Sequence, residues 1–344
     1  MRPGIAYVCL SLAVSLTVPI VCRQEQSQSP QPAQIARPPQ DPVKLRVDMV
    51  VLDAQVLQKK TARVVGGLTK SDFTLYEDGV RQQVTQFGQD SLPLSVLLLV
   101  DRGGCLDPFS SEVQRATLEA LNRLKPNDEV ALMAFSDDTE LVLGFRYDRQ
   151  QIAEAIDRMP RHDERANHCF NRAFYQAAKL MERAANPAGR RVIIMITGVT
   201  RDLGCTSGPS FTETRNEVLE SGAVVCGLIP SSAEQKAENG IMGTIASVAG
   251  VFKVPTSSLK QFADETGGEI FSEKAAELDH AFGTLVDHLR NRYTLGFVSS
   301  NTAHDGTYRK LKVDVVPEVA RREGGEVVVK TRRGYLAPKT RAGN

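Results

Sequence analysis

The chain has 344 residues, a length that favours two domains with non-globular ends. Hydrophobic residues make up 42% and charged residues 24%, the balance of a soluble protein with a buried core. The 42 Lys and Arg residues nearly balance the 41 Asp and Glu residues, so the formal net charge is +1. No global field therefore steers the protein toward nucleic acid or an anionic membrane.

The amino terminus has the layout of a secretory signal peptide, which we predict over residues 1–22. Arg2 precedes an apolar run that ends at Val21, and a polar stretch follows at once. The run is too short and too often interrupted by Ser and Thr for a membrane span. Cys22 suggests lipid anchoring as an alternative, but the preceding Pro-Ile-Val lacks the small residues that such cleavage needs. We expect an exported protein, periplasmic or secreted, with no integral span after cleavage.

Residues 23–43 are rich in Gln, Pro and Ser, which predicts a disordered linker. Order begins near Lys44, and residues 44–92 show the alternating apolar pattern of strands. A Glu77-Asp78-Gly79 turn between two such runs predicts a β-hairpin. This all-β block is too small to be stable alone.

Residues 93–291 alternate between buried strands and helices. The continuous apolar run from Ser95 to Val100 is typical of a parallel strand that is covered on both faces. Further strands are predicted at 130–135, 141–143, 191–196, 223–229 and 269–271, and helices at 170–185, 212–220 and 258–266. The alternation predicts an α/β fold with a doubly wound, mainly parallel sheet.

Residues 292–338 return to alternating strand patterns, and residues 339–344 read as a disordered tail. Each flanking β block alone would leave open edges and half a core. We therefore expect the two blocks to form one β-sandwich, into which the α/β domain is inserted.

Doubly wound sheets bind ligands beyond the carboxyl ends of their strands. Three segments fall there, at residues 101–105, 167–169 and 197–205. They contain neither a Gly-x-Gly-x-x-Gly turn nor a phosphate-binding loop with Lys-Ser/Thr, which argues against a nucleotide site.

Several blocks in consistent order carry a family resemblance between about Val47 and Pro338. They are Leu68–Gly79, Asp128–Phe135, Phe262–Gly268, Tyr293–Phe297 and Arg333–Pro338. On these blocks the chain resembles exported bacterial proteins that contain a von Willebrand factor type A-related domain, a Rossmann-like fold. The resemblance implies a protein-binding module.

The resemblance also implies a metal-ion-dependent adhesion site, in which Mg²⁺ is held by Asp-x-Ser-x-Ser, a Thr and a later Asp. Here Asp101 keeps the first position, whereas Gly103, Cys105, His168 and Thr197 stand at the other four. Glycine supplies no ligand, and thiol and imidazole are softer donors than Mg²⁺ prefers. We expect a degenerate site without Mg²⁺ and no cofactor.

Three hypotheses compete for what replaced the ion. In an oxidising compartment two of the loop cysteines would pair. We favour Cys105 with Cys205, with Cys169 as the alternative partner. A zinc site would use Asp101, Cys105, His168 and Cys205. A thiol enzyme would use Cys105 as the nucleophile, His168 as the base and Asp101 as the orienting group. Cys226, inside an apolar strand, is interpreted as a buried thiol.

The leading functional prediction is an exported, non-enzymatic adhesion-type module that binds an unidentified protein. Its expected partner face comprises Arg102, Leu106, Phe109, Phe170 and Asp202, together with His168. The alternatives are a thiol- or zinc-dependent enzyme and a structural component of envelope assembly. The sequence leaves the partner, the side of the outer membrane and the oligomeric state open.

Overall fold

The computed structural model describes residues 48–89, 92–159, 167–186, 190–202, 205, 207–231 and 258–339. The predicted signal peptide, the linker and residues 340–344 of the predicted tail lie outside the described residues. No helix in the described ranges is long and apolar enough to cross a membrane.

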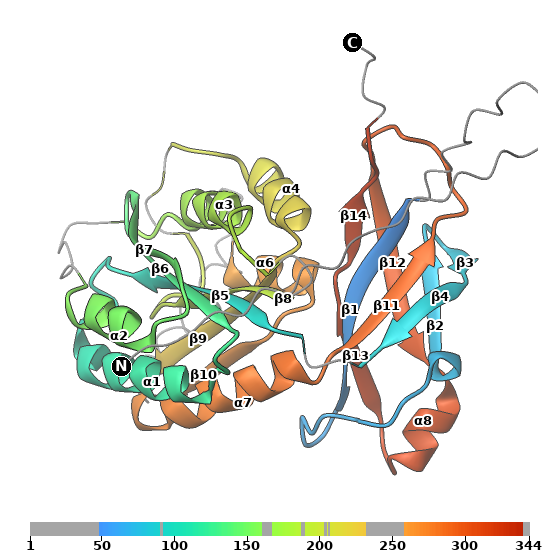
Figure 1. Ribbon diagram of the computed structural model, residues 1–344, viewed down its shortest axis with the longest axis horizontal. Helices are drawn as coiled ribbons and strands as arrows, with labels where there is room; N and C mark the ends of the chain where they lie inside the picture. Colours follow the sequence, from blue (N-terminus) through green and yellow to red (C-terminus); the bar gives the residue numbers. More distant parts are fainter. Residues whose placement is uncertain are drawn as a thin grey trace, which may run out of the picture. The chain divides into compact units, whose positions relative to one another are not determined.

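A six-stranded sheet forms the centre of the α/β domain, in the order β10-β9-β8-β5-β6-β7 (Figure 1). Its strands are β5 (Leu94–Asp101), β6 (Glu129–Phe135), β7 (Thr139–Arg146), β8 (Arg190–Ile196), β9 (Val224–Ser231) and β10 (Ile270–Lys274). Only β7 runs antiparallel to its neighbour, and the other pairs are parallel. The predicted doubly wound, mainly parallel sheet is confirmed.

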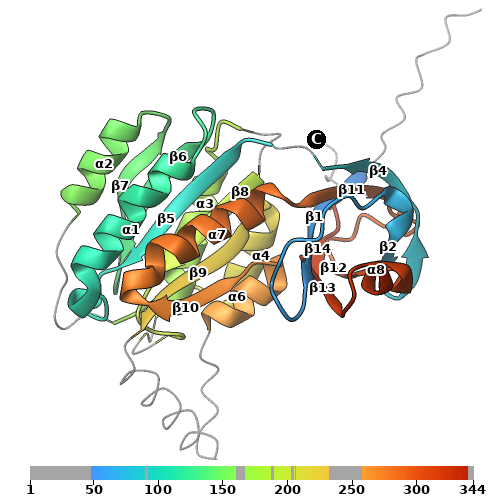
Figure 2. The same cartoon turned by 90° about the horizontal axis from the view of Figure 1, so that it is seen from below.

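Helices cover both faces of this sheet (Figure 2). One face packs against α1 (Ser110–Arg123), α2 (Arg149–Asp157) and α7 (Leu278–Arg290), and the other against α3 (Phe170–Met181), α4 (Phe211–Ser221) and α6 (Leu259–Thr266). Along β5, Leu98 and Val100 enter the first core while Leu97 and Leu99 enter the second. Because successive side chains of a strand point to opposite faces, a strand apolar throughout fits this double covering.

Local sequence signals set several helix ends. Ser210 begins α4 with a capping box, in which its hydroxyl accepts from the Glu213 N–H and the Glu213 carboxylate accepts from the Ser210 N–H. Gly222 ends the helix at a φ of 70°, a left-handed conformation that glycine adopts without strain. Helix α3 ends at Met181, one turn earlier than the predicted Ala185.

Two four-stranded antiparallel sheets form the β-sandwich, in the orders β13-β1-β11-β4 and β14-β12-β2-β3. Their strands are β1 (Met49–Gln58), β2 (Phe73–Glu77), β3 (Val80–Gln82), β4 (Val84–Gly88), β11 (Tyr293–Val298), β12 (Tyr308–Val315), β13 (Val327–Thr331) and β14 (Gly334–Leu336). A short helix, α8 (Pro317–Arg322), follows β12. Each sheet combines strands from before and after the α/β domain, so the predicted insertion is confirmed.

The sandwich core contains a buried tyrosine whose hydroxyl is hydrogen-bonded on both sides. Tyr293 is fully buried, and its hydroxyl donates to the Val65 carbonyl (3.0 Å) and accepts from the Leu68 N–H (3.1 Å). Its ring packs against Phe73 and Phe87. Because a buried hydroxyl without partners is costly, these bonds fix the loop before β2 onto β11.

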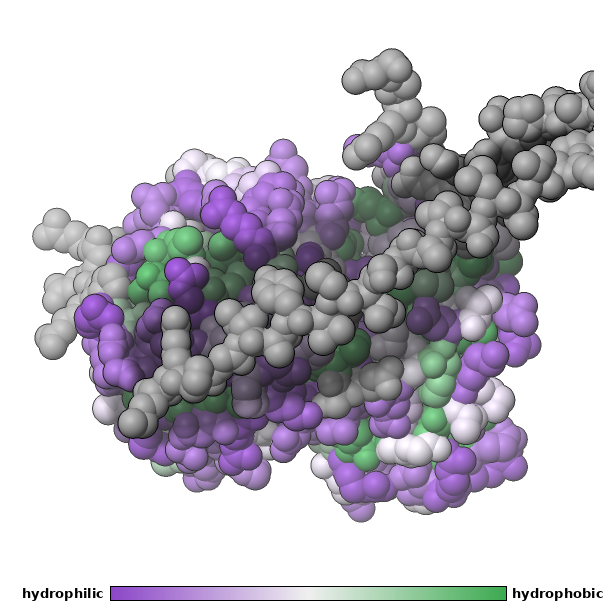
Figure 3. Space-filling view, in the orientation of Figure 1, coloured by the Kyte–Doolittle hydropathy of each residue, from purple (hydrophilic) through white to green (hydrophobic). Residues whose placement is uncertain are grey.

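On the face shown in Figure 3, hydrophobic residues form small groups among polar ones.

Candidate functional site

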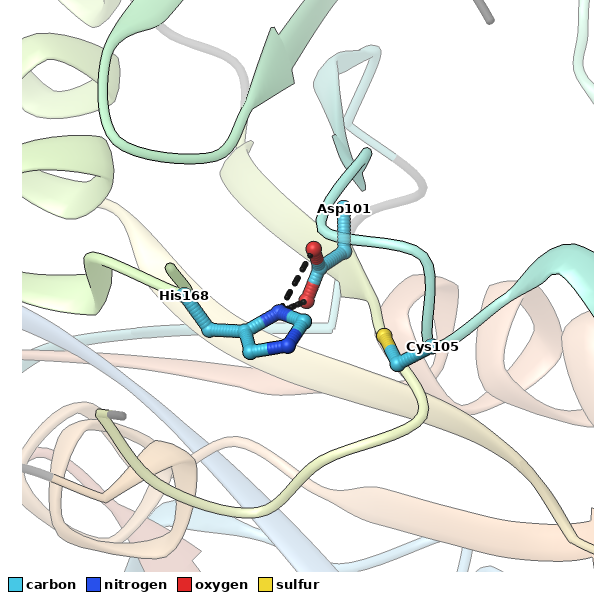
Figure 4. A group of neighbouring side chains, drawn as sticks. All are labelled: Asp101, Cys105 and His168. Atoms are coloured by element: carbon cyan, nitrogen blue, oxygen red, sulfur yellow. Dashed lines mark hydrogen bonds and ion pairs between the residues drawn. The ribbon is translucent and has the colours of Figure 1, made fainter. Parts of the chain in front are cut away.

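The site lies where β5 and β8 end. The two strands are parallel neighbours, with Val100 opposite Ile196, so the next residues, Asp101 and Thr197, emerge side by side. His168 comes from the segment that leads into α3. The structure therefore brings together the side chains that the sequence placed at the degenerate metal site (Figure 4).

The carboxylate of Asp101 is enclosed by donors from the protein itself. It accepts from the Gly103 N–H (2.8 Å), from the Thr197 hydroxyl (2.6 Å) and from His168, whose Nδ1 lies 2.9 Å from both carboxylate oxygens. Asp101 is only 3% exposed. A buried charge is costly unless it is paired and hydrogen-bonded, so these hydrogen bonds stabilise the buried carboxylate.

The imidazole of His168 lies directly over Gly103. A Cβ atom at position 103 would be 2.4 Å from Cε1 of the ring, far inside van der Waals contact. A serine at this position, as in the complete adhesion site, would therefore collide with the ring. The position of the His168 ring therefore depends on the absence of a side chain at Gly103.

Cys105 lies on the other side of Asp101. Its Sγ accepts from the Gly198 N–H (3.2 Å) and lies 3.9 Å from the Thr197 hydroxyl oxygen. Burial, followed by the negative charge of Asp101, raises the pKa of the Cys105 thiol to about 12. A nucleophilic cysteine needs the opposite shift, because the thiolate is the reactive form. This environment weighs against the thiol-enzyme hypothesis.

The disulfide joins Cys169 to Cys205, with a Cα–Cα separation of 5.5 Å, and Cys105 is free. The favoured Cys105–Cys205 pair is therefore wrong, and the alternative partner Cys169 is the one that bonds. The physical reason is the orientation of the Cys105 side chain. Its sulfur points toward the backbone that follows β8, where it accepts a hydrogen bond from the Gly198 N–H. Cys226 is fully buried and free, as the sequence indicated.

Asp202 caps the start of α3. The Phe170 N–H donates to its carboxylate, which supplies one of the acceptors that the first turn of a helix lacks. Burial raises the pKa of Asp202 to about 6, against the lowering effect of the backbone N–H groups of Phe170 and Asn171. The sequence placed Asp202 on the partner face without anticipating this capping role.

The expected partner face is only partly at the surface. Leu106, Phe109 and Phe170 are 7%, 8% and 0% exposed, which contradicts their assignment as exposed contact residues. They are core residues, because the loop and the helix entry that carry them pack onto the two faces of the sheet. His168, predicted on the same face, is also buried, at 8% exposed. Arg102 is partly exposed and lies 3.3 Å from the Glu140 carboxylate.

A hollow of about 580 Å³ opens beside Asp101, between α1 and the end of α2. Arg102, Asp107 and Gln114 contribute polar atoms, and Leu106 and Met159 contribute apolar ones.

Arg172, on α3, holds the loop between β6 and β7. Its guanidinium donates hydrogen bonds to the Asp137 carbonyl and to the Asp138 carboxylate. Nothing in the sequence marks this arginine, because no motif identifies a residue that bonds a neighbouring loop.

The donor set does not fit Mg²⁺. Magnesium prefers oxygen ligands in an octahedral shell, whereas this site offers one carboxylate and one hydroxyl, already bonded to each other, beside a thiol and an imidazole. The types of donor suit zinc better, since one ligand atom each from Asp101, Cys105 and His168 lies within 4.8 Å of the others. The fourth zinc ligand predicted from the sequence, Cys205, is instead bonded to Cys169.

Comparison with solved structures finds remote relatives of the fold. The BatB protein of Bacteroides thetaiotaomicron is 15% identical over 57% of this chain and 98% of its own, with a TM-score of 0.40. A von Willebrand factor type A protein of Catenulispora acidiphila is 11% identical over 86% of this chain and 74% of its own (TM-score 0.41). Proximal thread matrix protein 1 of the mussel byssus is 10% identical over 58% of this chain (TM-score 0.42), and the match spans 49% of that protein, about half its length.

A comparison with curated proteins finds no match to this chain. Residues 96–200 match the family model of the von Willebrand factor type A domain. That range begins in β5 and ends just after β8, and it contains every residue of the Asp101 network. Together with the six-stranded sheet covered on both faces, the match shows that the chain contains a von Willebrand factor type A domain.

Proposed function

We propose that this protein is an exported, non-enzymatic interaction module that binds a protein partner without magnesium, through the loops at the carboxyl ends of β5, β6 and β8. The observation that carries the proposal is the closed network around Asp101, whose carboxylate accepts from Gly103, His168 and Thr197. The domain family supports the general role, because type A domains are typically protein-binding modules.

The network bears on how a partner would be held. In a complete adhesion site, a carboxylate of the partner completes the coordination shell of Mg²⁺. Here the imidazole of His168 fills space beside Asp101, and position 103 has no side chain to offer. Binding at this end of the sheet therefore uses direct contacts with the protein.

The surface around the network is suited to such contacts. The hollow beside Asp101 can accept a side chain of the partner, with the polar groups of Arg102 and Asp107 at its margin. The Cys169–Cys205 disulfide and the bonds of Arg172 hold the adjoining loops in place. Loops that are already ordered lose less conformational entropy on binding.

Export is supported by the amino-terminal pattern and by the disulfide. Stable disulfides form in oxidising compartments, and the structure pairs Cys169 with Cys205 across two loops of the site. Amino-terminal sequencing of the mature protein from fractionated cells tests this step. A protein found in the cytoplasm with its first residues intact would contradict export.

The binding proposal is tested by partner capture followed by hydrogen-exchange mapping. The expected footprint covers residues 102–111 and 136–140, and binding should persist in EDTA. Asp107→Lys should weaken binding, whereas Asp287→Lys, a matched change of an exposed aspartate on α7, should not. A footprint confined to the sandwich strands would contradict the proposal, as would binding that requires Mg²⁺.

A zinc-dependent enzyme is the second candidate, because three zinc-type donors lie close together at Asp101, Cys105 and His168. Elemental analysis of the protein, purified without chelators, separates the two candidates. One equivalent of zinc that is lost in His168→Ala would favour the enzyme. A protein with no zinc and a free Cys105 thiol would favour the binding module. A purely structural envelope component would show no change in any interaction when the site loops are altered.

A further inference from the structure

A second hollow, of about 560 Å³, lies at the opposite end of β8 from the Asp101 network. Arg190 and Arg191 begin this strand, whereas Thr197 follows its other end. Its lining includes apolar side chains, among them Met49, Val51 and Phe87, and three arginines, Arg190, Arg191 and Arg332. The volume is in the range of sites that bind small molecules.

Arg190 is fully engaged within the protein. Its Nη1 and Nη2 donate to the carbonyls of Leu289 (2.7 Å) and Arg292 (2.6 Å), and its Nε lies 3.5 Å from a carboxylate oxygen of Asp53. The other carboxylate oxygen of Asp53 accepts from the Thr294 hydroxyl (3.2 Å). The one carboxylate lining the hollow thus belongs to the ion pair with Arg190.

Arg191 and Arg332 make fewer hydrogen bonds within the protein than Arg190 does. Arg191 donates to the Ser221 carbonyl (2.9 Å) and Arg332 to the Leu219 carbonyl (3.2 Å), so both reach the last turn of α4. Neither makes an ion pair with any residue in the described part of the chain. A guanidinium has five N–H donors, and most of those on these two side chains remain available.

The hydrogen bonds to the end of α4 do not neutralise the positive charges of Arg191 and Arg332. The carboxyl end of a helix carries about half a negative charge, against the two full positive charges placed there. Burial lowers the pKa of Arg332, and the charge of Asp53 only partly opposes this effect. A half-buried cation without a counter-ion is unfavourable, so a group that brings negative charge into the hollow would relieve this cost.

We propose that the hollow binds a small organic anion. Its carboxylate or phosphate group lies against Arg191 and Arg332, and its apolar part lies against Met49, Val51 and Phe87. The planar guanidinium fork matches either head group through paired N–H bonds. The exposed fractions of Met49 and Val51, 46% and 44%, leave apolar surface that such a ligand would cover. The inference is independent of the partner site at Asp101.

Calorimetric titration of the full protein with decanoate, decyl phosphate and decanol tests the proposal. We expect at least one of the two anions to bind, with affinity that falls as KCl is raised, and decanol to bind at least about tenfold more weakly. The stronger of the two anions identifies the head group. Equal affinity for decanol and the anions would overturn the proposal, and so would the absence of binding by either anion.

Substitutions locate the site. Arg191→Gln combined with Arg332→Gln should weaken anion binding about tenfold or more, because each charge-assisted bond contributes substantially. Arg158→Gln, which alters an arginine at the C-cap of α2 with a side chain 74% exposed, is the matched control and should leave binding unchanged. Unaltered binding in the double variant would overturn the proposal.

A labelling experiment on the unaltered protein covers the case in which the double variant does not fold. Phenylglyoxal modifies accessible arginines, and mass spectrometry locates the modified residues. The anion that binds should protect Arg191 and Arg332 but not Arg158, and decanol should protect none of them. Labelling of Arg191 and Arg332 that is unaffected by the bound anion would place the ligand elsewhere and overturn the assignment.

Discussion

Asp101 is a buried carboxylate that accepts hydrogen bonds from Gly103, Thr197 and His168. Two changes in the chain act together to allow it. His168 supplies a ring nitrogen at 2.9 Å, and Gly103 leaves the space that the ring fills. The sequence predicts the loss of the Mg²⁺ ligands, because each replaced position can be read off directly. It could not show that the replacements contact one another, since that depends on how the loops before α3 and after β5 fold.

This pairing predicts a conditional effect of Gly103→Ala. The new Cβ would lie 2.4 Å from the His168 ring, so the ring must move and its bond to Asp101 must weaken. We expect a loss of about 1–3 kcal/mol in the free energy of unfolding, measured by urea denaturation. In a His168→Ala background the same substitution should cost much less. Gly66→Ala, where a Cβ meets no atom within 4 Å, is the control. Equal costs in both backgrounds would contradict the pairing.

Asp202 predicts a pH dependence of stability. Its folded pKa, about 6, is raised above the value of 3.8 for an unperturbed Asp, so the folded protein holds this proton more tightly than the unfolded chain. The stability that this proton contributes is fully present below pH 3.8 and is lost as the pH rises through about 6. Between pH 4.5 and 7 the parent should therefore lose stability relative to Asp202→Asn. Thermal unfolding of both proteins at each pH measures the difference, and parallel curves would contradict the assignment.

At the scale of elements, the alternation of strands and helices made the α/β domain predictable, whereas contacts between loops were not. The capping box at Ser210 and the apolar β5 mark their elements through local signals. Phe170 was assigned to the surface from its position beside the site loops, yet it is fully buried at the start of α3. The disulfide partner of Cys205 was equally undetermined, since Cys105 and Cys169 both lie on loops at the same end of the sheet.

The Cys169–Cys205 bond should stabilise the site loops. It closes a segment with a sequence separation of 36, for which the chain-entropy model gives about 3–4 kcal/mol. Replacing both cysteines by Ser should lower the free energy of unfolding by up to that amount, and Cys105→Ser is the control, since Cys105 forms no disulfide. Dithiothreitol should destabilise the parent and the Cys105→Ser protein but leave the double variant unchanged. A destabilising effect of the reductant on the double variant would mean that another disulfide carries the stability.

At the scale of the whole molecule, the β-sandwich is completed by strands that follow the α/β domain in the sequence. β1 lies between β11 and β13, both of which come more than 200 residues later, so its neighbours on both sides are supplied by the carboxyl-terminal block. This arrangement was predictable from the sequence because each block alone leaves half a core. The particular strand order was not, since alternation alone does not specify which strands pair.

Removal of residues 293–344 tests the dependence of β1 on the later strands. The shortened chain would leave β1 without β11 and β13, and β2 without β12, and the aromatic cluster around Tyr293 would lose its central ring. Because isolated hairpins with half a core are marginal in water, the amides of β1 should exchange rapidly with solvent. Peptides covering β5, whose parallel neighbours β6 and β8 remain, should stay protected and serve as the internal control. Protection of β1 at the level of the full chain would show that the amino-terminal block folds without its carboxyl-terminal partners.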